Sequence, residues 1–168
     1  MFKRLVAIGA GTLLAAGMGV SAASAQAAPP SPDGSFTMTV NKTAYTNHWK
    51  TLITVTGTYK CTLTGGWTPT NSGINADVTQ VQSRRYVVRG QGGTMGAGLT
   101  CNGKAQKWSL DVQAMVNGMT PATWKAGYVA AGIGANVMDG TCDMGGCTPG
   151  AHNLGLNFDK VLQIVVRK

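Results

Sequence analysis

The chain has 168 residues and a net charge of +8, contains 24 glycines, and has charged side chains at only 12% of its positions. Every acidic residue is an aspartate, so the chain lacks glutamate, which the exposed faces of long helices favour. The composition therefore argues against a helical bundle and favours strands and turns in a single domain.

The first 27 residues have the pattern of a secretory signal peptide. Lys3 and Arg4 form a basic start, an apolar stretch follows from 5 to 20, and A-x-A cleavage sites end at Ala25 and Ala27. We favour cleavage after Ala27 over Ala25, because the extended segment APPSPDGS then becomes the mature start. Loss of the two basic residues lowers the net charge from +8 to +6.

The residues after the signal predict one domain outside the cytoplasm. We expect a flexible N-terminus over 28–35 and a single domain over 36–168. The apolar stretch of the signal is short and glycine-rich, and no later stretch approaches the length that spans a bilayer. The sequence therefore predicts a secreted, extracellular protein without a stable membrane span.

Two segments alternate apolar and polar residues with the period of a half-buried strand. Over 51–61 the apolar residues share one parity and threonines take most of the other, and 107–116 repeats the alternation. The residues predicted to face the core in these two strands are Ile53, Val55, Tyr59, Cys61, Trp108, Leu110, Val112, Ala114 and Val116. Shorter strands are predicted at 35–40, 74–82, 84–90 and 161–166.

The segment 123–138 has a composition that suits either a helix or a strand. We interpret it as a strand, because Gly127, Gly132 and Gly134 disfavour a helix. Six to eight short strands separated by glycine-rich connections then predict an all-β fold, a single immunoglobulin-like antiparallel β-sandwich. Trp108 is expected in its core.

All four cysteines follow the signal peptide. An even number in an oxidising compartment predicts two disulfides. Cys142 and Cys147 bracket the short, turn-like DMGG and can close locally, which leaves Cys61 with Cys101. A zinc site is the alternative, but the spacings do not match paired C-x-x-C units and the two histidines are far off in sequence, so we expect no metal or other cofactor.

The stretch GLTCNGKA, residues 98–105, resembles a phosphate-binding loop without being one. Such a loop follows a strand, leads into a helix and ends in a hydroxyl that holds magnesium. Here Ala105 stands where the hydroxyl belongs, and a strand is predicted next. Asn102 and Gly103 are better interpreted as a tight hairpin turn.

Two motifs, GTYKC at 57–61 and CNGKAQKW at 101–108, resemble an uncharacterised family of small secreted actinobacterial domains. Members carry a GTY-basic-Cys strand and a Cys-Asp/Asn-Gly turn followed by a tryptophan. The resemblance covers about 39–168, supports the Cys61 to Cys101 pairing and implies no activity. The chain departs from the family at Gln106 and Lys107, where a histidine is expected.

The segment 139–159 resembles the closing hairpin of the neocarzinostatin-type apoproteins, which are secreted immunoglobulin-like sandwiches that hold an antibiotic chromophore. In that family too a short local disulfide precedes the last strand. The resemblance implies a shared hairpin architecture, with or without a shared ligand.

Groups that could do catalysis are few. His48 and His152 are the two histidines, and no nucleophile-elbow sequence is present. Asp33, Asp139 and Asp143 have the neighbours of turn residues. We therefore expect a protein that is not an enzyme, with a small hydrolase around His152 and Asp139 or Asp143 as the remote alternative.

Candidate ligand-binding residues are two tryptophans and a group of cations. Trp67 lies in a Gly/Thr loop and Trp49 beside His48, where each is placed to stack on a flat ligand, although Trp67 folding back over the core is the plainer interpretation. The GQGGTMGAG loop, 90–98, is a further candidate contact. The cations are Arg84, Arg85, Arg89, Lys104 and Lys107, which suit an anionic polymer or simply a solvated face.

These features predict a secreted, non-enzymatic binding module that uses a loop end. Its expected ligands are a cell-envelope glycan or a small hydrophobic metabolite. The alternative is an extracellular inhibitor or protein-interaction domain that presents the Cys142–Cys147 hairpin. Specific nucleic-acid binding is not expected, because no base-stacking pattern or groove-reading helix is present.

Overall fold

The computed structural model describes residues 25–28, 31–94, 98–139, 142–143, 146–147 and 152–166. Most of the predicted signal peptide lies outside these residues, as do 95–97 of the GQGGTMGAG segment and the side chains of Cys142 and Cys147. Within the described part no helix occurs, and hence none that is long and apolar enough to cross a membrane.

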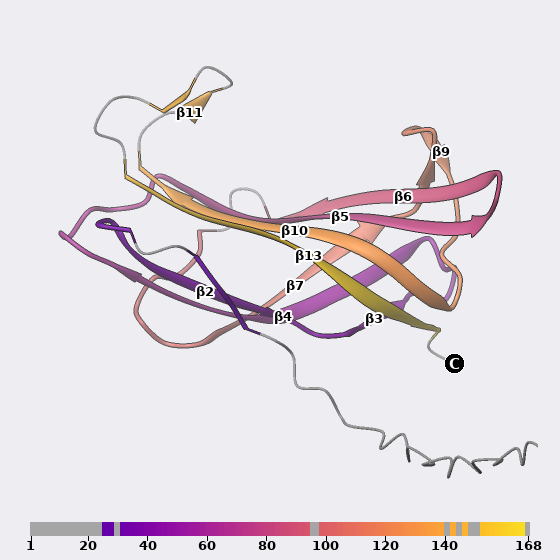
Figure 1. Ribbon diagram of the computed structural model, residues 1–168, viewed down its shortest axis with the longest axis horizontal. Helices are drawn as coiled ribbons and strands as arrows, with labels where there is room; N and C mark the ends of the chain where they lie inside the picture. Colours follow the sequence, from indigo (N-terminus) through magenta and orange to yellow (C-terminus); the bar gives the residue numbers. More distant parts are fainter. Residues whose placement is uncertain are drawn as a thin grey trace, which may run out of the picture.

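The all-β prediction is confirmed, with more strands than the six to eight expected (Figure 1). The described residues form β1 (Gln26–Ala27), β2 (Gly34–Val40), β3 (Thr43–Thr46), β4 (Leu52–Leu63), β5 (Asn71–Ser83), β6 (Tyr86–Gly93), β7 (Gln106–Gln113), β8 (Met115–Val116), β9 (Thr120–Pro121), β10 (Gly127–Met138), β11 (Cys142–Asp143), β12 (Gly146–Cys147) and β13 (Asn153–Val166). Several of the extra strands are only two residues long, too short to show a sequence period.

Hydrogen bonds join eleven of the described strands into one sheet. The order is β1-β2-β4-β3-β13-β10-β5-β6-β8-β9, and β7 pairs with the other edge of β4. β11 and β12 form a separate two-stranded sheet. In Figure 1, β5, β6 and β10 lie above β2, β4 and β7, and the buried side chains of both groups belong to one core cluster. The large sheet therefore encloses its apolar face by folding over.

One strand pair departs from the antiparallel prediction. β3 runs parallel to β13, with Thr43 opposite Gln163 and Thr46 opposite Val166. A parallel pair needs a long connection, and here most of the domain separates the two strands. Period-two alternation records which face is buried but carries no information on such a distant partner.

The predicted inward parity of both long strands is confirmed. Ile53, Val55, Tyr59 and Cys61 in β4 are buried, as are Trp108, Leu110 and Val112 in β7 and Ala114 just after it, while Val116 is half-buried. The segment 123–138 contains β10, which confirms a strand there. Trp124, just before β10, is fully buried and donates its Nε1–H to the carbonyl of Val112 over 3.2 Å.

Glycines allow two strands to cross without side chains between them. A Cβ on Gly90 would lie 2.2 Å from the carbonyl oxygen of Gln113, and one on Gly92 would lie 2.3 Å from that of Asp111. β6 thus crosses β7 in backbone contact, which only glycine permits. The prediction of a loop over 90–98 is therefore wrong for Gln91–Gly93, which belong to β6, while Gly90 also ends the strand predicted over 84–90.

The Cys61–Cys101 disulfide is confirmed and ties β4 to the segment before β7. The hairpin predicted at Asn102–Gly103 is not found there, because Gly103 alone of the two has positive φ, and its N–H bonds to the carbonyl of Cys61. An Asn-Gly pair in which both residues have positive φ is found instead at Asn117–Gly118, in the three-residue connection between β8 and β9.

Part of the segment 28–35, which is predicted as a flexible N-terminus, pairs with the rest of the domain. β2 begins at Gly34, Ser31 forms a bridge to Gly34, and the N–H of Ala28 bonds to the carbonyl of Phe36. The physical reason is the long-range partners of Asp33, described below. Cleavage after Ala27 would remove β1, whereas cleavage after Ala25 would keep it.

Candidate functional site

Several exposed turns meet at one end of the molecule, which we call the basic end. Pairing places the end of β3 and the start of β4 beside the end of β7, while the β5–β6 turn lies near the start of β10. The basic end comprises His48, Trp49 and Lys50 of the β3–β4 turn, Arg84, Arg85 and Tyr86 of the β5–β6 turn, Asn117, Gly118 and Met119 of the β8–β9 turn, and Lys125 and Tyr128.

Trp49 stands on a turn that its neighbours hold in place. The Oδ1 of Asn47 accepts the backbone N–H of Thr51 at 2.9 Å and of Leu52 at 3.2 Å, and the N–H of Lys50 bonds back to the carbonyl of Asn47. The indole of Trp49 is 74% exposed and meets the His48 ring edge-on at 5.0 Å. A large aromatic face is therefore presented to solvent from a fixed backbone.

The β5–β6 turn adds cations at the same end of the molecule. Arg84 and Arg85 are exposed between the two strands. Side-chain hydrogen bonds secure the neighbouring backbone, since Gln82 donates to the carbonyl of Thr123 and Gln80 to that of Lys125, each over 2.8 Å. The two arginines therefore project from a turn whose base is fastened to the segment before β10.

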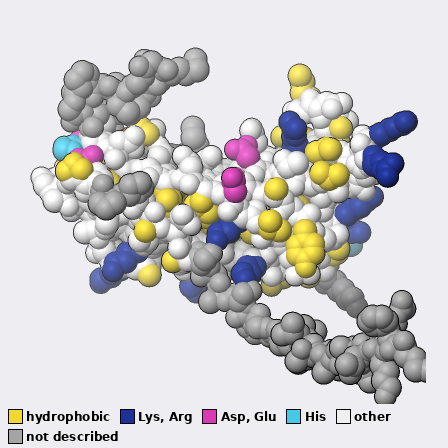
Figure 2. Space-filling model, viewed as in Figure 1, with side chains coloured by type: hydrophobic (Ala, Val, Ile, Leu, Met, Phe, Trp, Pro, Cys, Tyr) yellow, Lys and Arg dark blue, Asp and Glu magenta, His cyan; other side chains and the backbone are white. Residues whose placement is uncertain are grey.

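The charged side chains of the basic end are all positive. Figure 2 shows several Lys and Arg side chains over the end where β5, β6 and β9 turn, with apolar side chains among them. None of the three turns contains an aspartate. Two of the apolar side chains here are among the most solvent-exposed in the described part of the chain, Met119 at 89% and Tyr128 at 72%. The basic end therefore combines positive charge with aromatic and apolar contact area.

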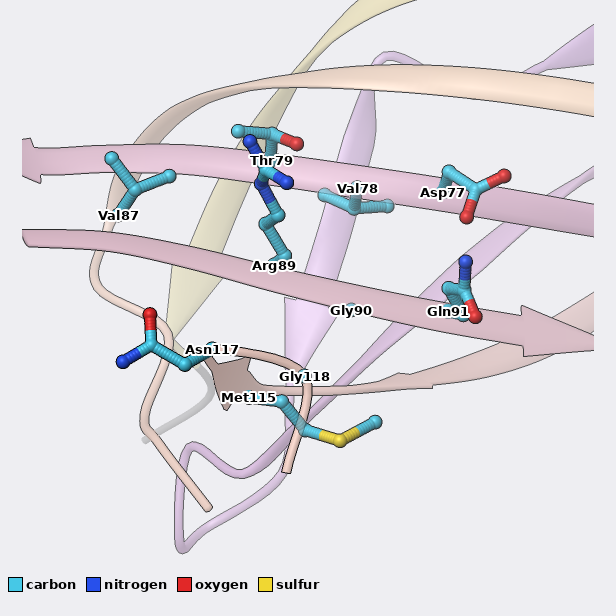
Figure 3. A pocket seen from close by; sticks show the side chains of 10 residues that line it. All are labelled: Asp77, Val78, Thr79, Val87, Arg89, Gly90, Gln91, Met115, Asn117 and Gly118. Atoms are coloured by element: carbon cyan, nitrogen blue, oxygen red, sulfur yellow. The ribbon is translucent and has the colours of Figure 1, made fainter. Parts of the chain in front are cut away.

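A groove of about 620 Å³ opens on the outer face next to the basic end (Figure 3). β5 and β6 form its floor and the β8–β9 hairpin forms a wall. Its lining residues are Asp77, Val78, Thr79, Val87, Arg89, Gly90, Gln91, Met115, Asn117 and Gly118. Because the floor carries both an acid and a base, the groove is poorly suited to a purely apolar metabolite.

Trp67 lies at the opposite end, where it is part of a cluster. Its ring stacks on that of His152 at 5.2 Å, and its Nε1–H donates to the carbonyl of Asp33 over 2.9 Å. The ring is partly buried against the core. Trp67 therefore folds back over the core and does not form an exposed stacking platform. Because it lies at the opposite end, the length of the sheet separates it from Trp49.

His152 in this cluster is held by aspartates. Its Nδ1 lies 2.7 Å from Oδ1 of Asp33, and its backbone N–H donates to Oδ1 of Asp139 over 2.7 Å. The hydrogen bond to Asp33 raises the pKa of His152, and the same bond is the main cause that lowers the pKa of Asp33. The acid beside the ring is thus Asp33, whereas the sequence indicated Asp139 or Asp143.

The described residues give the His152 cluster no catalytic set. No serine or threonine hydroxyl in the described ranges bonds to the ring. Nor does any group of three His, Cys, Asp or Glu side chains in that part of the chain have the arrangement of a metal site. What the cluster does is fasten three distant segments, those of Asp33, Trp67 and His152.

The structure thus divides the residues that the sequence singled out. Trp49, Arg84 and Arg85 share the basic end, and Arg89 lies in the adjoining groove. Lys104 precedes β7 and Lys107 is near its start, whereas the end of β7 is the part near Arg89. Six residue steps along the strand, about 20 Å, separate Lys107 from Gln113. The five cations do not form one patch.

Sequence reasoning missed two residues of this surface. Asp77 and Tyr128 each lie on the outward parity of a strand, so the alternation of β5 and β10 could have marked them as exposed. Their neighbourhood could not have been found in this way, because it depends on which strands pair. Comparisons with protein families, with curated proteins and with solved structures find no match to this chain.

Proposed function

We propose that the protein is a secreted, non-enzymatic binding module whose basic end binds a polyanionic polymer of the cell envelope. The proposal includes a signal peptide over 1–27, an immunoglobulin-like sandwich as the fold type, and a second disulfide between Cys142 and Cys147. The observation that carries it is an exposed tryptophan on a fixed turn at the same end of the molecule as Arg84 and Arg85, an end whose turns contain no aspartate.

Two physical contributions would act together at this surface. Exposed cations attract a polyanion over the range of the Debye length, about 10 Å at 0.1 M salt, so this part of the affinity falls as salt rises. An aromatic ring adds contact area at small cost in side-chain entropy, and this part resists salt. The arginines supply the electrostatic contribution and Trp49 supplies the aromatic one.

The test compares polymers that differ in charge alone. We expect the mature protein to co-sediment with phosphocellulose and with purified cell wall at low salt, and to bind unmodified cellulose much less. Arg84→Ala with Arg85→Ala should weaken binding about tenfold at low salt. Trp49→Ala should weaken the binding that persists at high salt.

A matched control removes the same charge elsewhere. Lys104→Ala with Lys107→Ala also deletes two cations, but away from the basic end. This control should bind like the unaltered protein. Equal losses in both double variants would show that net charge alone drives binding, and undiminished binding by the arginine variant would overturn the proposal.

The alternative, an interaction domain that presents a disulfide hairpin, has one specific observation in its favour. β11 and β12 pair Cys142 directly with Cys147 and stand apart from the large sheet, at the end opposite β9 (Figure 1). Directly opposed strand residues have the spacing that a disulfide needs. This hairpin would present a preorganised loop to a protein partner.

A further inference from the structure

The groove beside the basic end places an acid and a base on one face without pairing them. Thr79 of β5 is opposite Arg89 of β6, and Asp77 is opposite Gln91, so Asp77 and Arg89 are diagonal neighbours. Diagonal neighbours on one sheet face have Cβ atoms about 7 to 8 Å apart. No ion pair or hydrogen bond joins the two side chains, and both line the groove.

Figure 3 shows how the two charges lie. The Arg89 side chain extends from β6 toward Thr79, while Asp77 projects from β5 beside Gln91. The guanidinium and the carboxylate therefore lie along one strand, two residues apart. Thr79 and Gln91 add neutral hydrogen-bonding groups between and beside them, and Met115 lies on the opposite wall.

The acidic side of the groove continues past its edge. Gly132 of β10 is the next residue across from Asp77, and Asp159 of β13 follows on the far side. Gly132 has no side chain to fill the space, and Oδ1 of Asp159 lies only 3.5 Å from where its Cβ would be. Two carboxylates thus border one open position on a chain whose net charge is positive.

From this arrangement we propose that the groove binds a zwitterion, with its ammonium group between Asp77 and Asp159 and its carboxylate or phosphate on Arg89. Charge-assisted hydrogen bonds are stronger than neutral ones, and the planar guanidinium suits a bidentate anion. A dipeptide fits the spacing, because two extended residues span about 7 Å from the ammonium to the carboxylate. This inference is independent of polymer binding, which uses the turns of the basic end.

The experiment is an NMR titration of backbone amides with four probes. Dialanine carries both charges, N-acetyl-dialanine lacks the ammonium, dialanine amide lacks the carboxylate, and phosphoethanolamine replaces the carboxylate by a phosphate. We expect saturable shifts at 77–79 and 89–91 with the two zwitterions, and binding about tenfold weaker with each blocked dipeptide. Tighter binding of phosphoethanolamine than of dialanine would assign a phosphate zwitterion, and the reverse a peptide.

Variants assign the two charges separately. Arg89→Gln should remove the preference for dialanine over its amide, and Asp77→Asn the preference for dialanine over its N-acetyl form. Lys107→Gln and Asp111→Asn make the same charge changes on exposed residues outside the groove and should leave all four affinities unchanged. Because the altered side chains are exposed, their spectra should remain those of the folded protein. Equal binding of blocked and free dipeptides, or no saturable shift with either zwitterion, would overturn the proposal.

Discussion

His152 and Asp33 lie 119 residues apart in the chain, yet Nδ1 of His152 is 2.7 Å from Oδ1 of Asp33. The other carboxylate oxygen of Asp33 accepts the N–H of Asn153 at 3.1 Å. One side chain near the start of the domain thus holds the beginning of its last strand, while Trp67 stacks on the histidine. This contact explains why residues 31–35 are ordered and how the 64–70 loop is held.

The His152–Asp33 bond makes a contribution to stability that depends on pH. The pKa of His152 is raised above 6.5, chiefly by the bond to Asp33, so its contribution is complete below pH 6.5 and is lost as pH rises through the raised value. The pKa of Asp33 is lowered below 3.8 by the same bond, so its contribution is lost only as pH falls through the lowered value. We expect this contribution to the Tm to be largest between pH 3.8 and 6.5.

An NMR titration of the His152 ring, with melting curves at pH 5 and pH 8, measures both quantities. Asp33→Asn should return the pKa of His152 toward its ordinary value and flatten the difference in Tm. Since the side chains of His152 and Asp33 keep 41% and 21% of their surface exposed, water screens the bond and the change in Tm should be small. A ring that titrates identically in the variant would contradict this account.

Gly90→Ala tests the backbone contact between β6 and β7. The added Cβ would meet the carbonyl oxygen of Gln113, which belongs to backbone and cannot rotate away. We expect destabilisation of about 2 to 3 kcal/mol in urea unfolding. Gly98→Ala is the control, because a Cβ there meets nothing within 4 Å, and it should be close to neutral. Similar midpoints for the two variants would argue against the close crossing.

Removing the Cys61–Cys101 disulfide should destabilise the fold through the unfolded chain. The bond closes a loop with a sequence separation of 40 residues, for which the chain-entropy model gives about 4 kcal/mol. Urea unfolding of the double variant Cys61→Ala with Cys101→Ala measures this loss. The single variant Cys101→Ala also breaks the disulfide but keeps the buried Cys61 side chain, so the difference between the two variants is the contribution of that side chain. Little change in the double variant would mean that the loop is already constrained when unfolded.

Mass mapping of the unreduced protein tests the second disulfide. We expect two linked peptide pairs, Cys61 with Cys101 and Cys142 with Cys147. The second pairing rests on the register of β11 with β12. A peptide linking Cys61 to Cys142 would contradict both pairings at once.

Truncation of two tryptophans should have very different effects on the stability of the fold. Trp124 is fully buried and bonded to the carbonyl of Val112, so Trp124→Ala should destabilise by about 3 to 5 kcal/mol. Trp49 is 74% exposed, so Trp49→Ala should leave the unfolding midpoint almost unchanged. The pair also shows that any loss of polymer binding in the Trp49 variant is not a loss of folding.

The local pattern of this sequence was enough to predict its fold class and several elements. Alternation over 51–61 and 107–116 identified the buried face of β4 and β7, because a strand half-buried against a core has period two whatever its partners. Glycine content resolved 123–138 as a strand for an equally local reason, the cost of glycine in a helix. The Cys61–Cys101 bond followed by elimination, because Cys142 and Cys147 are close enough in the sequence to pair locally.

Only the tertiary structure decided which distant residues lie next to one another. The glycines at 90 and 92 have the local appearance of a loop, and only the passage of β7 beneath them explains their place in a strand. Trp67 is turned inward by His152 and Asp33, and Arg89 becomes a diagonal neighbour of Asp77 only through the register of β5 with β6. Burial parity depends on neighbours one or two residues away, which the sequence contains, whereas these contacts depend on strand order and register, which distant segments determine together.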